Sequence, residues 1–263
     1  MSTGDGNSEI YALNQNGTGT ISEDTEILLD ESEKLYTDTD GVFDITIYPV
    51  MDAWGFTTQN YRIPSDEELK GLLENVNASK IQYDKASKKV ALPAGVKIDF
   101  GGIAKGYTIL KNYGYLQKCG VTSGMVSLGG NVQLLGAKPD GSFWRVAVQS
   151  RMIPMTIWEF LRRKIRLLSL LADTRGILKK MERFIITLLI LATGYPAENG
   201  LKSVTIVSDD GTLADGLSTS LFIMGKDKAC DFWKEHSDKF DMILMTDEQR
   251  VIRVRGNCRC IQF

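Results

Sequence analysis

The pattern of apolar and polar positions predicts a chain in which short helices and strands are interspersed. Apolar residues recur at helical spacing in Ile21–Tyr36, where Ser22 is a candidate N-cap, and in the stretch that begins at Pro64 with Leu69 on its buried face. Further helices are expected at Lys105–Cys119, Ala214–Met224 and Lys228–His236. These segments are long enough for helices of two to four turns.

Strands are expected where β-branched and aromatic residues cluster between turn-forming residues. The expected strands are Val42–Val50, Ile81–Tyr83, Lys89–Leu92, Val96–Phe100, Met125–Leu128, Trp144–Val148, Ser203–Val207 and Met242–Met245. They do not alternate regularly with helices, as a parallel βαβ sheet would require. The order of elements therefore predicts an α+β fold.

Composition narrows the function classes. The 263 residues carry a net charge of -2, whereas a nucleic-acid-binding protein normally has a basic field, so no nucleic-acid partner is expected. The four cysteines lack the paired spacing of a zinc site. The longest apolar run, Phe184–Leu191, is far shorter than the roughly 20 residues of a membrane span. No signal peptide is visible, because a polar run follows Met1.

The strongest local signal for chemistry is the segment from Asp99 to Tyr107, which reads Asp-Phe-Gly-Gly-Ile-Ala-Lys-Gly-Tyr. An acid ends the expected strand, two glycines allow close backbone approach, and Lys105 opens a helix. A helix N-terminus and a lysine both favour a phosphate. A tight strand-to-helix turn without any ligand fits the same residues, because the segment matches neither a P-loop nor a dinucleotide fingerprint.

Asp215 and Thr219 form a second signal, because residues four apart lie on one face of a helix and can share one hard cation. The alternative is that Asp215 caps its helix. A third signal is Asp44, which interrupts an apolar strand and needs a partner or water. The alternative there is a satisfied carboxylate on an edge strand. Gly129-Gly130-Asn131 follows a strand and also suits a plain hairpin turn.

Taken together in order and spacing, these motifs resemble the ApbE flavin transferase family. The resemblance rests on Phe43-Asp44-Ile45-Thr46, Trp54-Gly55-Phe56, the glycine-rich segment after Asp99, Ser127-Leu128-Gly129-Gly130-Asn131, Thr193-Gly194-Tyr195-Pro196 and Ala214-Asp215 with Thr219. It implies one ApbE-like domain over residues 1–263, with a T-fold-like arrangement of mixed and antiparallel sheets packed with helices. It also implies an FAD:protein FMN transferase that moves FMN from FAD to a Thr or Ser hydroxyl and releases AMP.

The resemblance assigns roles to individual residues. FAD contacts are expected at Val42, Phe43, Asp44, Asp99 and Lys105. The magnesium ligands are expected to be the carbonyl of Gly102 and the side chains of Asp215 and Thr219. The family also implies a protein acceptor, such as a subunit of a membrane redox complex, and a membrane-anchored, lipoprotein-like location in the periplasm or outside the cytoplasm. Residues 1–14 resemble an internal family segment, so an earlier strand, helix and export signal are expected to be missing.

Residues 151–191 depart from the family, and we interpret them as translated out of frame. Codons exist for Ser169–Ile177 and Phe184–Leu191 that, read at one shared offset, restore the family's Thr-Ser-Gly and His-His-Ile-Thr-Asp-Pro segments. The catalytic residue is therefore unknown, because the expected histidine is missing near Ile186-Thr187. The tail after about residue 252 admits a similar interpretation. We expect a chain of this sequence to fold poorly and to transfer FMN weakly or not at all.

Two alternatives remain open. A genuine insertion at 151–191 has a basic first half and an apolar second half, which suit an amphipathic helix against a membrane or partner. The whole chain can also be a protein that binds FAD without transferring it, or a structural module that binds no flavin. The single histidine, His236, is expected to be structural or at the surface rather than catalytic.

Overall fold

The computed structural model describes residues 1–148, 156–158, 165–172, 188–248, 250–256 and 258–262. These residues form two compact units, and each is described by itself. The first contains residues 1–104 and the end of the stretch 174–198, and the second contains residues 105–173 and 199–263. The single-domain assignment over 1–263 stays a prediction.

The first unit joins helices to a small antiparallel sheet of order β1-β3-β2. Its elements are α1 (Glu9–Asn16), β1 (Thr18–Thr20), α2 (Glu23–Asp38), η1 (Ile45–Ile47), α3 (Tyr48–Ala53), α4 (Asp66–Leu73), η2 (Ala78–Lys80), β2 (Gln82–Asp84) and β3 (Lys89–Ala91). The predicted helix at Ile21–Tyr36 is confirmed as α2, and its N-cap Ser22 accepts a hydrogen bond from the Thr25 backbone N–H. The helix predicted after Pro64 is confirmed as α4 and has Ser65 as its cap.

A cluster of apolar side chains in this unit joins segments that are far apart in sequence. Trp54 and Leu69 are buried together with Leu189, and the indole N–H of Trp54 donates to the carbonyl oxygen of Gly194 at 2.8 Å. The Tyr195 ring meets Trp54 edge-on at 5.7 Å between centroids. Two motifs of the family resemblance, around Trp54 and around Gly194, therefore share one core.

Two predicted strands of this unit are wrong. Val42–Val50 contains η1 and α3 instead, because Asp44 caps η1 and a proline stands in the first turn of α3. Val96–Phe100 belongs to none of the described strands. The side chain of Asn14 bonds both backbone groups of Ile98 at 2.8 Å and so takes the place of a neighbouring strand.

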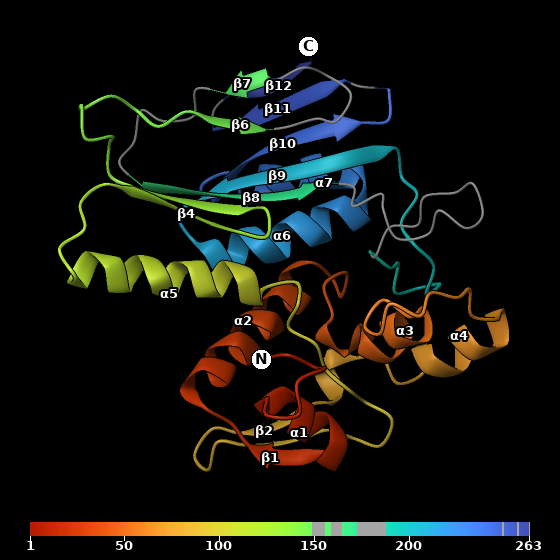
Figure 1. Cartoon of the computed structure of the whole chain (residues 1–263). Helices are drawn as coiled ribbons and strands as arrows, with labels where there is room; N and C mark the ends of the chain where they lie inside the picture. Colours follow the sequence, from red (N-terminus) through yellow and green to blue (C-terminus); the bar gives the residue numbers. More distant parts are fainter. Residues whose placement is uncertain (149–155, 159–164, 173–187, 249, 257, 263) are drawn as a thin grey trace. The chain divides into compact units, whose positions relative to one another are not determined.

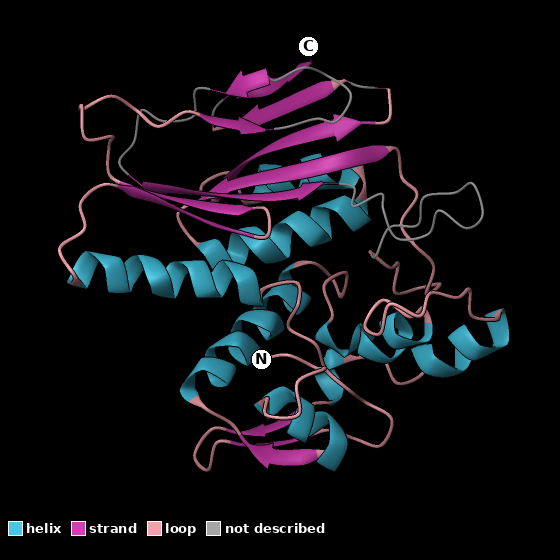
Figure 2. Ribbon diagram, in the orientation of Figure 1, coloured by secondary structure: helices cyan, strands magenta, loops and turns pink. Residues whose placement is uncertain are grey.

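The second unit is built on a seven-stranded antiparallel sheet of order β12-β11-β10-β9-β8-β5-β4 (Figure 2). Its elements are α5 (Ala104–Lys118), β4 (Gly124–Leu128), β5 (Asn131–Leu135), β6 (Val146–Val148), β7 (Thr156–Trp158), β8 (Ile165–Ala172), β9 (Leu201–Ser208), α6 (Gly211–Met224), α7 (Lys226–Glu235), β10 (Phe240–Thr246), β11 (Val251–Arg255) and β12 (Cys258–Gln262). All ladders between the described strands are antiparallel, so the expected mixed pairing does not occur among them.

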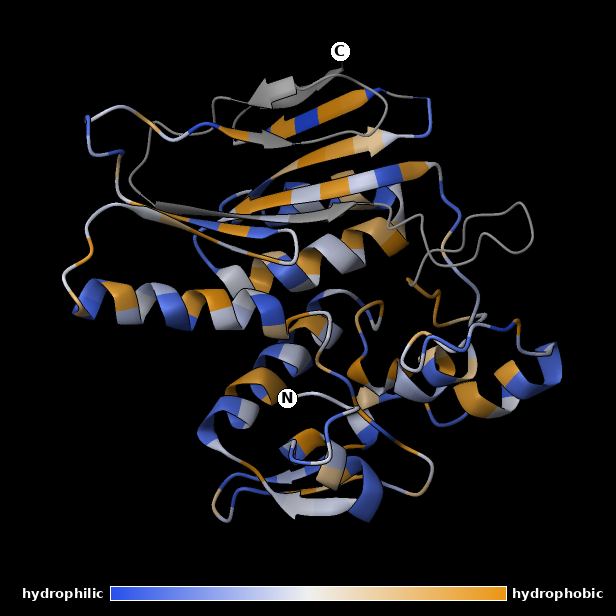
Figure 3. Cartoon of the chain, in the orientation of Figure 1, coloured by the Kyte–Doolittle hydropathy of each residue, from blue (hydrophilic) through white to orange (hydrophobic). Residues whose placement is uncertain are grey.

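Both faces of this sheet are covered. Helix α6 packs on β8 and β9, and α7 lies against β10. On the other face, Leu134, Val207 and Ile243 are buried, and Trp144 and Val146 pack on them. Figure 3 shows that β10 is mostly hydrophobic, as expected for a strand buried on both sides. The predicted α+β fold is confirmed.

Segment 151–191 is described only in part. Residues 156–158 and 165–172 are strands, so the amphipathic helix expected under the insertion alternative is not found there. Leu189 is buried in the first unit and forms a bridge with Pro196. Ile186 and Thr187, where the family histidine was expected, lie outside the described residues. The out-of-frame interpretation stays a prediction.

Candidate functional site

Asp215 is a buried carboxylate in the second turn of α6. The helix is capped by Asp210, whose Oδ1 accepts from the backbone N–H of Thr212 and Leu213, so the capping alternative for Asp215 is wrong. The Asp215 residue is 4% exposed. Its Oδ2 accepts from the backbone N–H of Gly106 at 2.9 Å, and its Oδ1 lies 3.8 Å from the Lys105 ammonium nitrogen. A buried acid thus faces the first turn of α5.

The first turns of α5 and α6 touch through their backbones. A Cβ added to Gly106 would lie 2.0 Å from the carbonyl oxygen of Gly211 and 2.7 Å from Cβ of Asp215. No side chain fits at that distance, so glycine is required. This contact explains how the Gly106 N–H reaches the Asp215 carboxylate.

Burial raises the pKa of Asp215 above its usual value, because the charged form loses hydration. The nearby charge of Lys105, the Asn131 side chain and the backbone N–H groups of α5 oppose this rise. A buried carboxylate beside a lysine ammonium group is suited to hold a cation.

The turn Gly129-Gly130 adds a third element to the site. Both glycines have positive φ, 55° and 97°, and join β4 to β5 in a two-residue hairpin, as the plain alternative expected. The turn also packs on the stem of Lys105, since a Cβ on Gly129 would lie 3.1 Å from Cδ of that lysine. Asn131, the next residue, is 1% exposed. The hairpin therefore borders Lys105, the residue that pairs with Asp215.

Three polar residues near Asp215 or the hairpin, which are Asn131, Ser169 and Ser218, were not predicted as side chains of the site. Asn131 was only part of a turn motif, and Ser169 and Ser218 carried no signal at all. Ser169 donates to Oδ1 of Asn131 at 2.6 Å and lies 3.3 Å from the Ser218 hydroxyl. Strand pairing brings Ser169 opposite Asn131, and local sequence does not reveal this register.

Asp44, in the first unit, is 6% exposed and fully engaged. Its Oδ1 accepts from the Thr46 backbone N–H at 2.7 Å and from the Thr46 hydroxyl at 2.6 Å, and its Oδ2 accepts from the Ala78 N–H at 3.0 Å. Burial raises its pKa, and these hydrogen bonds oppose the shift. The edge-strand alternative was right that the carboxylate is satisfied, but it caps a 3-10 turn instead of lying in a strand.

Asp99 lies next to this segment. Its backbone N–H donates to the carbonyl oxygen of Ile45 at 2.8 Å, and its Oδ2 accepts from the Gly101 N–H at 3.1 Å. Phe43 is 5% exposed and Val42 is partly exposed. The first unit therefore gathers the segment at 42–44 and Asp99, which were separate signals in the sequence. Their FAD contacts stay predictions.

The predicted magnesium ligands come from both units. Gly102 belongs to the first, while Asp215 and Thr219 lie one helical turn apart on α6 in the second. Among the described residues, no group of three or more acidic, histidine or cysteine side chains is placed to hold a metal. Magnesium does not need such a group, because it is usually held by one or two carboxylates together with substrate phosphates. Asp215 and Thr219, which both lie on α6, are donors of the kind that this mode of binding uses; the complete ligand set with Gly102 stays a prediction.

His236 is a structural residue, as expected. It follows the last turn of α7, its Nδ1 lies 2.9 Å from the carbonyl oxygen of Phe232, and its ring stacks on that phenylalanine at 4.3 Å. These local contacts account for the side chain.

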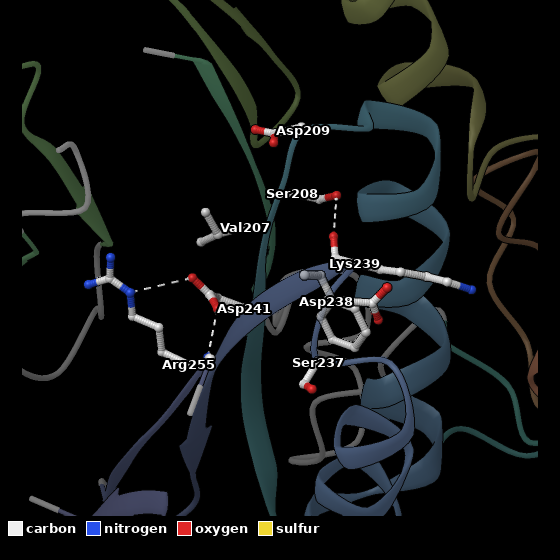
Figure 4. Close-up of a pocket in the computed structure, with 10 residues that line it drawn as sticks. Val207, Ser208, Asp209, Ser237, Asp238, Lys239, Asp241 and Arg255 are labelled. Carbon is white, nitrogen blue, oxygen red and sulfur yellow. Dashed lines mark hydrogen bonds and ion pairs between the residues drawn. The ribbon is translucent and has the colours of Figure 1, made fainter. Parts of the chain in front are cut away.

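A separate pocket of about 330 Å³ lies where β9 ends and β10 begins (Figure 4). Asp241 points into it, accepts from the Gly256 N–H at 3.2 Å and lies 3.7 Å from Nε of Arg255. Asp209 and Asp238 also line the pocket. It contains none of the predicted site residues. Among the described residues, no helix is long and apolar enough to cross a membrane.

Comparison with known proteins identifies the family. Residues 1–244 match the profile of the ApbE family. The chain is 30% identical to the FAD:protein FMN transferase of Haemophilus influenzae, over 94% of this chain and 75% of that protein. It is 27% identical to the protein of the same name from Vibrio cholerae, over 94% and 76%.

A solved structure agrees with this assignment. The ApbE protein of Thermotoga maritima superposes with a TM-score of 0.86 at 29% identity, covering 96% of this chain and 83% of that protein. The fold therefore indicates the same family as the order of the sequence motifs. The chain belongs to the ApbE family.

Proposed function

We propose that this chain is an FAD:protein FMN transferase. The observation that carries the proposal is the buried Asp215, held by the first turn of α5 beside Lys105, in a chain whose relatives from H. influenzae and V. cholerae carry that name. A carboxylate, a lysine and a helix N-terminus together suit a charged diphosphate and its counter-ion.

The proposed reaction transfers FMN, through its phosphate group, from FAD to a Thr or Ser hydroxyl of an acceptor protein. The hydroxyl oxygen forms a bond to the phosphorus of the FMN half, the pyrophosphate P–O bond breaks, and AMP leaves. The hydroxyl proton is released. Phosphoryl transfer of this kind depends on positioning and on stabilising charge in the transition state.

Each predicted residue has a role in this proposal. The Asp215 and Thr219 side chains, with the Gly102 carbonyl that the family resemblance adds, would hold Mg²⁺, which would supply positive charge to stabilise the pyrophosphate. Lys105 binds a phosphate oxygen, and its side chain is 42% exposed where it packs beside the turn at Gly129. Asp44 accepts hydrogen bonds from Thr46 and Ala78 and so orders the segment at 42–46, which is proposed to contact FAD.

The activity of this chain is predicted to be impaired. No general base is assigned, because the expected histidine position lies outside the described residues and His236 is bound locally in α7. FAD binding without transfer is therefore the second candidate. A single-base insertion or deletion near codons 150 and 192 in the encoding DNA would support the out-of-frame interpretation, and clean codons would exclude it.

One assay separates the candidates. The chain is incubated with FAD, Mg²⁺ and an acceptor protein, and AMP release and protein-bound flavin fluorescence are followed together. AMP and covalent flavin appearing in equal amounts support the transferase. Tight FAD binding with neither product supports the binding protein, and no FAD binding refutes both.

We further propose that the acceptor is a subunit of a membrane redox complex and that the site of action is the cell envelope. Measuring protein-bound flavin in separated cell fractions tests both parts of this proposal.

A further inference from the structure

Strand β4 forms one edge of the seven-stranded sheet (Figure 1). Within the described part of the chain, no strand pairs with its outer side. Its side chains are also accessible: Met125 is 54% exposed and Leu128 is 39% exposed, whereas most of the neighbouring strand β5 is buried. Strand β4 is therefore an open edge on which a further strand fits.

The register of the hairpin shows which backbone groups of β4 face outward. Leu128 closes the two-residue turn to β5, and the closing pair of such a hairpin is hydrogen-bonded. Hydrogen-bonded and non-hydrogen-bonded pairs alternate along an antiparallel ladder, so Val126 also bonds to β5. The backbone N–H and C=O groups of Ser127 and Met125 consequently point away from β5, toward the open edge.

This edge has none of the features that usually protect an edge strand from pairing with another chain. Gly124–Leu128 contains no charged residue and no proline, and its pairing with β5 runs without a bulge. An uncharged edge with outward-facing backbone groups is a template for an extended polypeptide, whose main-chain hydrogen bonds then supply the affinity.

The edge leads to the proposed transfer site. The turn that ends β4 packs on Lys105, because a Cβ on Gly129 would lie 3.1 Å from Cδ of that lysine. The ammonium nitrogen of Lys105 lies 3.8 Å from Oδ1 of Asp215. A strand added to β4 would lie about 5 Å from it and would advance about 3.3 Å per residue. The part of that strand just beyond Leu128 would therefore lie beside the turn and Lys105.

We propose that the open edge of β4 is the docking surface for the acceptor polypeptide, which binds as an added strand and presents its Thr or Ser hydroxyl just beyond Leu128. The inference rests on the proposed function, because it presupposes a protein acceptor. A protein acceptor is the occupant that this edge suits, since the hydroxyl must arrive on an extended backbone and the edge offers backbone groups next to Lys105.

The test is the binding of a fluorescein-labelled peptide of alternating threonine and valine between terminal lysines. Binding to the full-length chain without FAD is followed by fluorescence anisotropy. A generic strand-forming peptide suffices, because backbone pairing carries the affinity. The same peptide N-methylated at two adjacent central residues lacks one N–H on each of its edges, and it is expected to bind about tenfold more weakly.

Two variants at one position separate backbone pairing from side-chain contact. Ser127→Pro removes an outward N–H that the ladder with β5 does not use, so the edge strand tolerates the proline, and peptide binding is expected to weaken about tenfold. Ser127→Ala keeps the N–H and is expected to bind the peptide like wild type. Circular dichroism checks that both variants fold. If Ser127→Pro does not fold, the N-methylated peptide tests the same pairing on the wild-type chain.

Titration of the same samples with FAD separates this inference from the proposed function. A chain that binds FAD but not the peptide, or that binds both peptides equally, overturns the docking edge and leaves the transferase proposal standing. A chain that binds neither FAD nor peptide contradicts both. If gel filtration shows a dimer that Ser127→Pro converts to a monomer, and the peptide does not bind, the edge joins two copies of this chain and the inference is overturned.

Discussion

Lys105 occupies the position of a cation at Asp215, and its removal is expected to strengthen divalent-cation binding when no nucleotide is present. The lysine nitrogen lies 3.8 Å from Oδ1, whereas the Gly106 N–H donates to Oδ2. A divalent ion at Oδ1 must displace the ammonium group. Lys105→Met removes that competitor, so its effect on cation affinity is opposite to its effect on nucleotide affinity.

The size of the effect follows from the pair's geometry and exposure. Two unit charges about 4 Å apart interact by about 4 kcal/mol at an effective dielectric constant near 20. The Lys105 side chain is 42% exposed, so solvent screening reduces the interaction toward the about 1 kcal/mol typical of exposed pairs. We therefore expect Lys105→Met to bind Mg²⁺ about fivefold more tightly, because 1.4 kcal/mol corresponds to a factor of ten.

Titration calorimetry with Mg²⁺ in the absence of FAD measures this difference. Lys111→Met is the control, because Lys111 lies on the same helix, 5.7 Å from the Tyr107 ring centroid, and its loss changes the net charge equally. The difference between the variants is expected to shrink at high salt. Mg²⁺ affinity that is equal in both variants, or weaker in Lys105→Met, refutes the competition. With FAD present, Lys105→Met is expected to weaken flavin binding.

Three further predictions concern stability. Gly106→Ala places a Cβ against the Gly211 carbonyl and is expected to lower the free energy of unfolding by about 1–3 kcal/mol. Gly114→Ala on the same helix meets open space and is expected to raise it by about 0.5–1 kcal/mol. Urea unfolding compares the two variants, and equal midpoints would contradict the close contact at Gly106. The pKa of Asp44 is raised in the folded state, so its contribution to the free energy of unfolding is full below its usual value of 3.8 and is lost as pH rises through the higher folded value. Across this pH window the melting temperature of wild type is expected to fall relative to that of Asp44→Asn. Parallel melting-temperature profiles for the two proteins would contradict this prediction. Trp54→Phe leaves the Gly194 carbonyl without its indole donor and is expected to cost about 1–3 kcal/mol; an unchanged unfolding midpoint argues that water replaces the bond.

Local sequence predicted the elements whose causes are local. Ser22 was recognisable as a cap because it is followed by acids and an apolar period, and it caps α2; the helix start predicted at Pro64 is also confirmed, with Ser65 as the cap of α4. The hairpin at Gly129-Gly130 could also be predicted from local sequence, because glycine tolerates positive φ. Four strands of the second unit, β4, β6, β9 and β10, were predicted within a few residues of their observed bounds, whereas β5, β7, β8, β11 and β12 were not predicted.

The errors arose where tertiary contacts decide. Val96–Phe100 has strand composition, but a side chain from 84 residues earlier, Asn14, binds its backbone in place of a strand. Asp215 looked like a cap, although Asp210 stands closer to the helix start and takes that role. Asn131 and Ser169 meet only through the register of β5 and β8. No spacing rule along the chain brings these residues together.

The family motifs located the site more completely than the residues alone. Spacing suggested Asp215 and Thr219 as a pair and Lys105 as a phosphate contact, but it left open whether either bound anything. The structure joins Lys105 and Asp215 at 3.8 Å and joins the Asp99 backbone to Ile45, beside Asp44, at 2.8 Å. The magnesium ligand set and the flavin contacts remain predictions.

Flavin binding with and without magnesium examines the role of Asp215 independently of transfer. FAD fluorescence is titrated with wild-type chain and with Asp215→Asn, in Mg²⁺ and in a chelator. We predict that Mg²⁺ strengthens FAD binding by wild type and has no effect on Asp215→Asn. Equal strengthening by Mg²⁺ in both proteins, or none in wild type, would show that Asp215 does not hold an ion against the diphosphate.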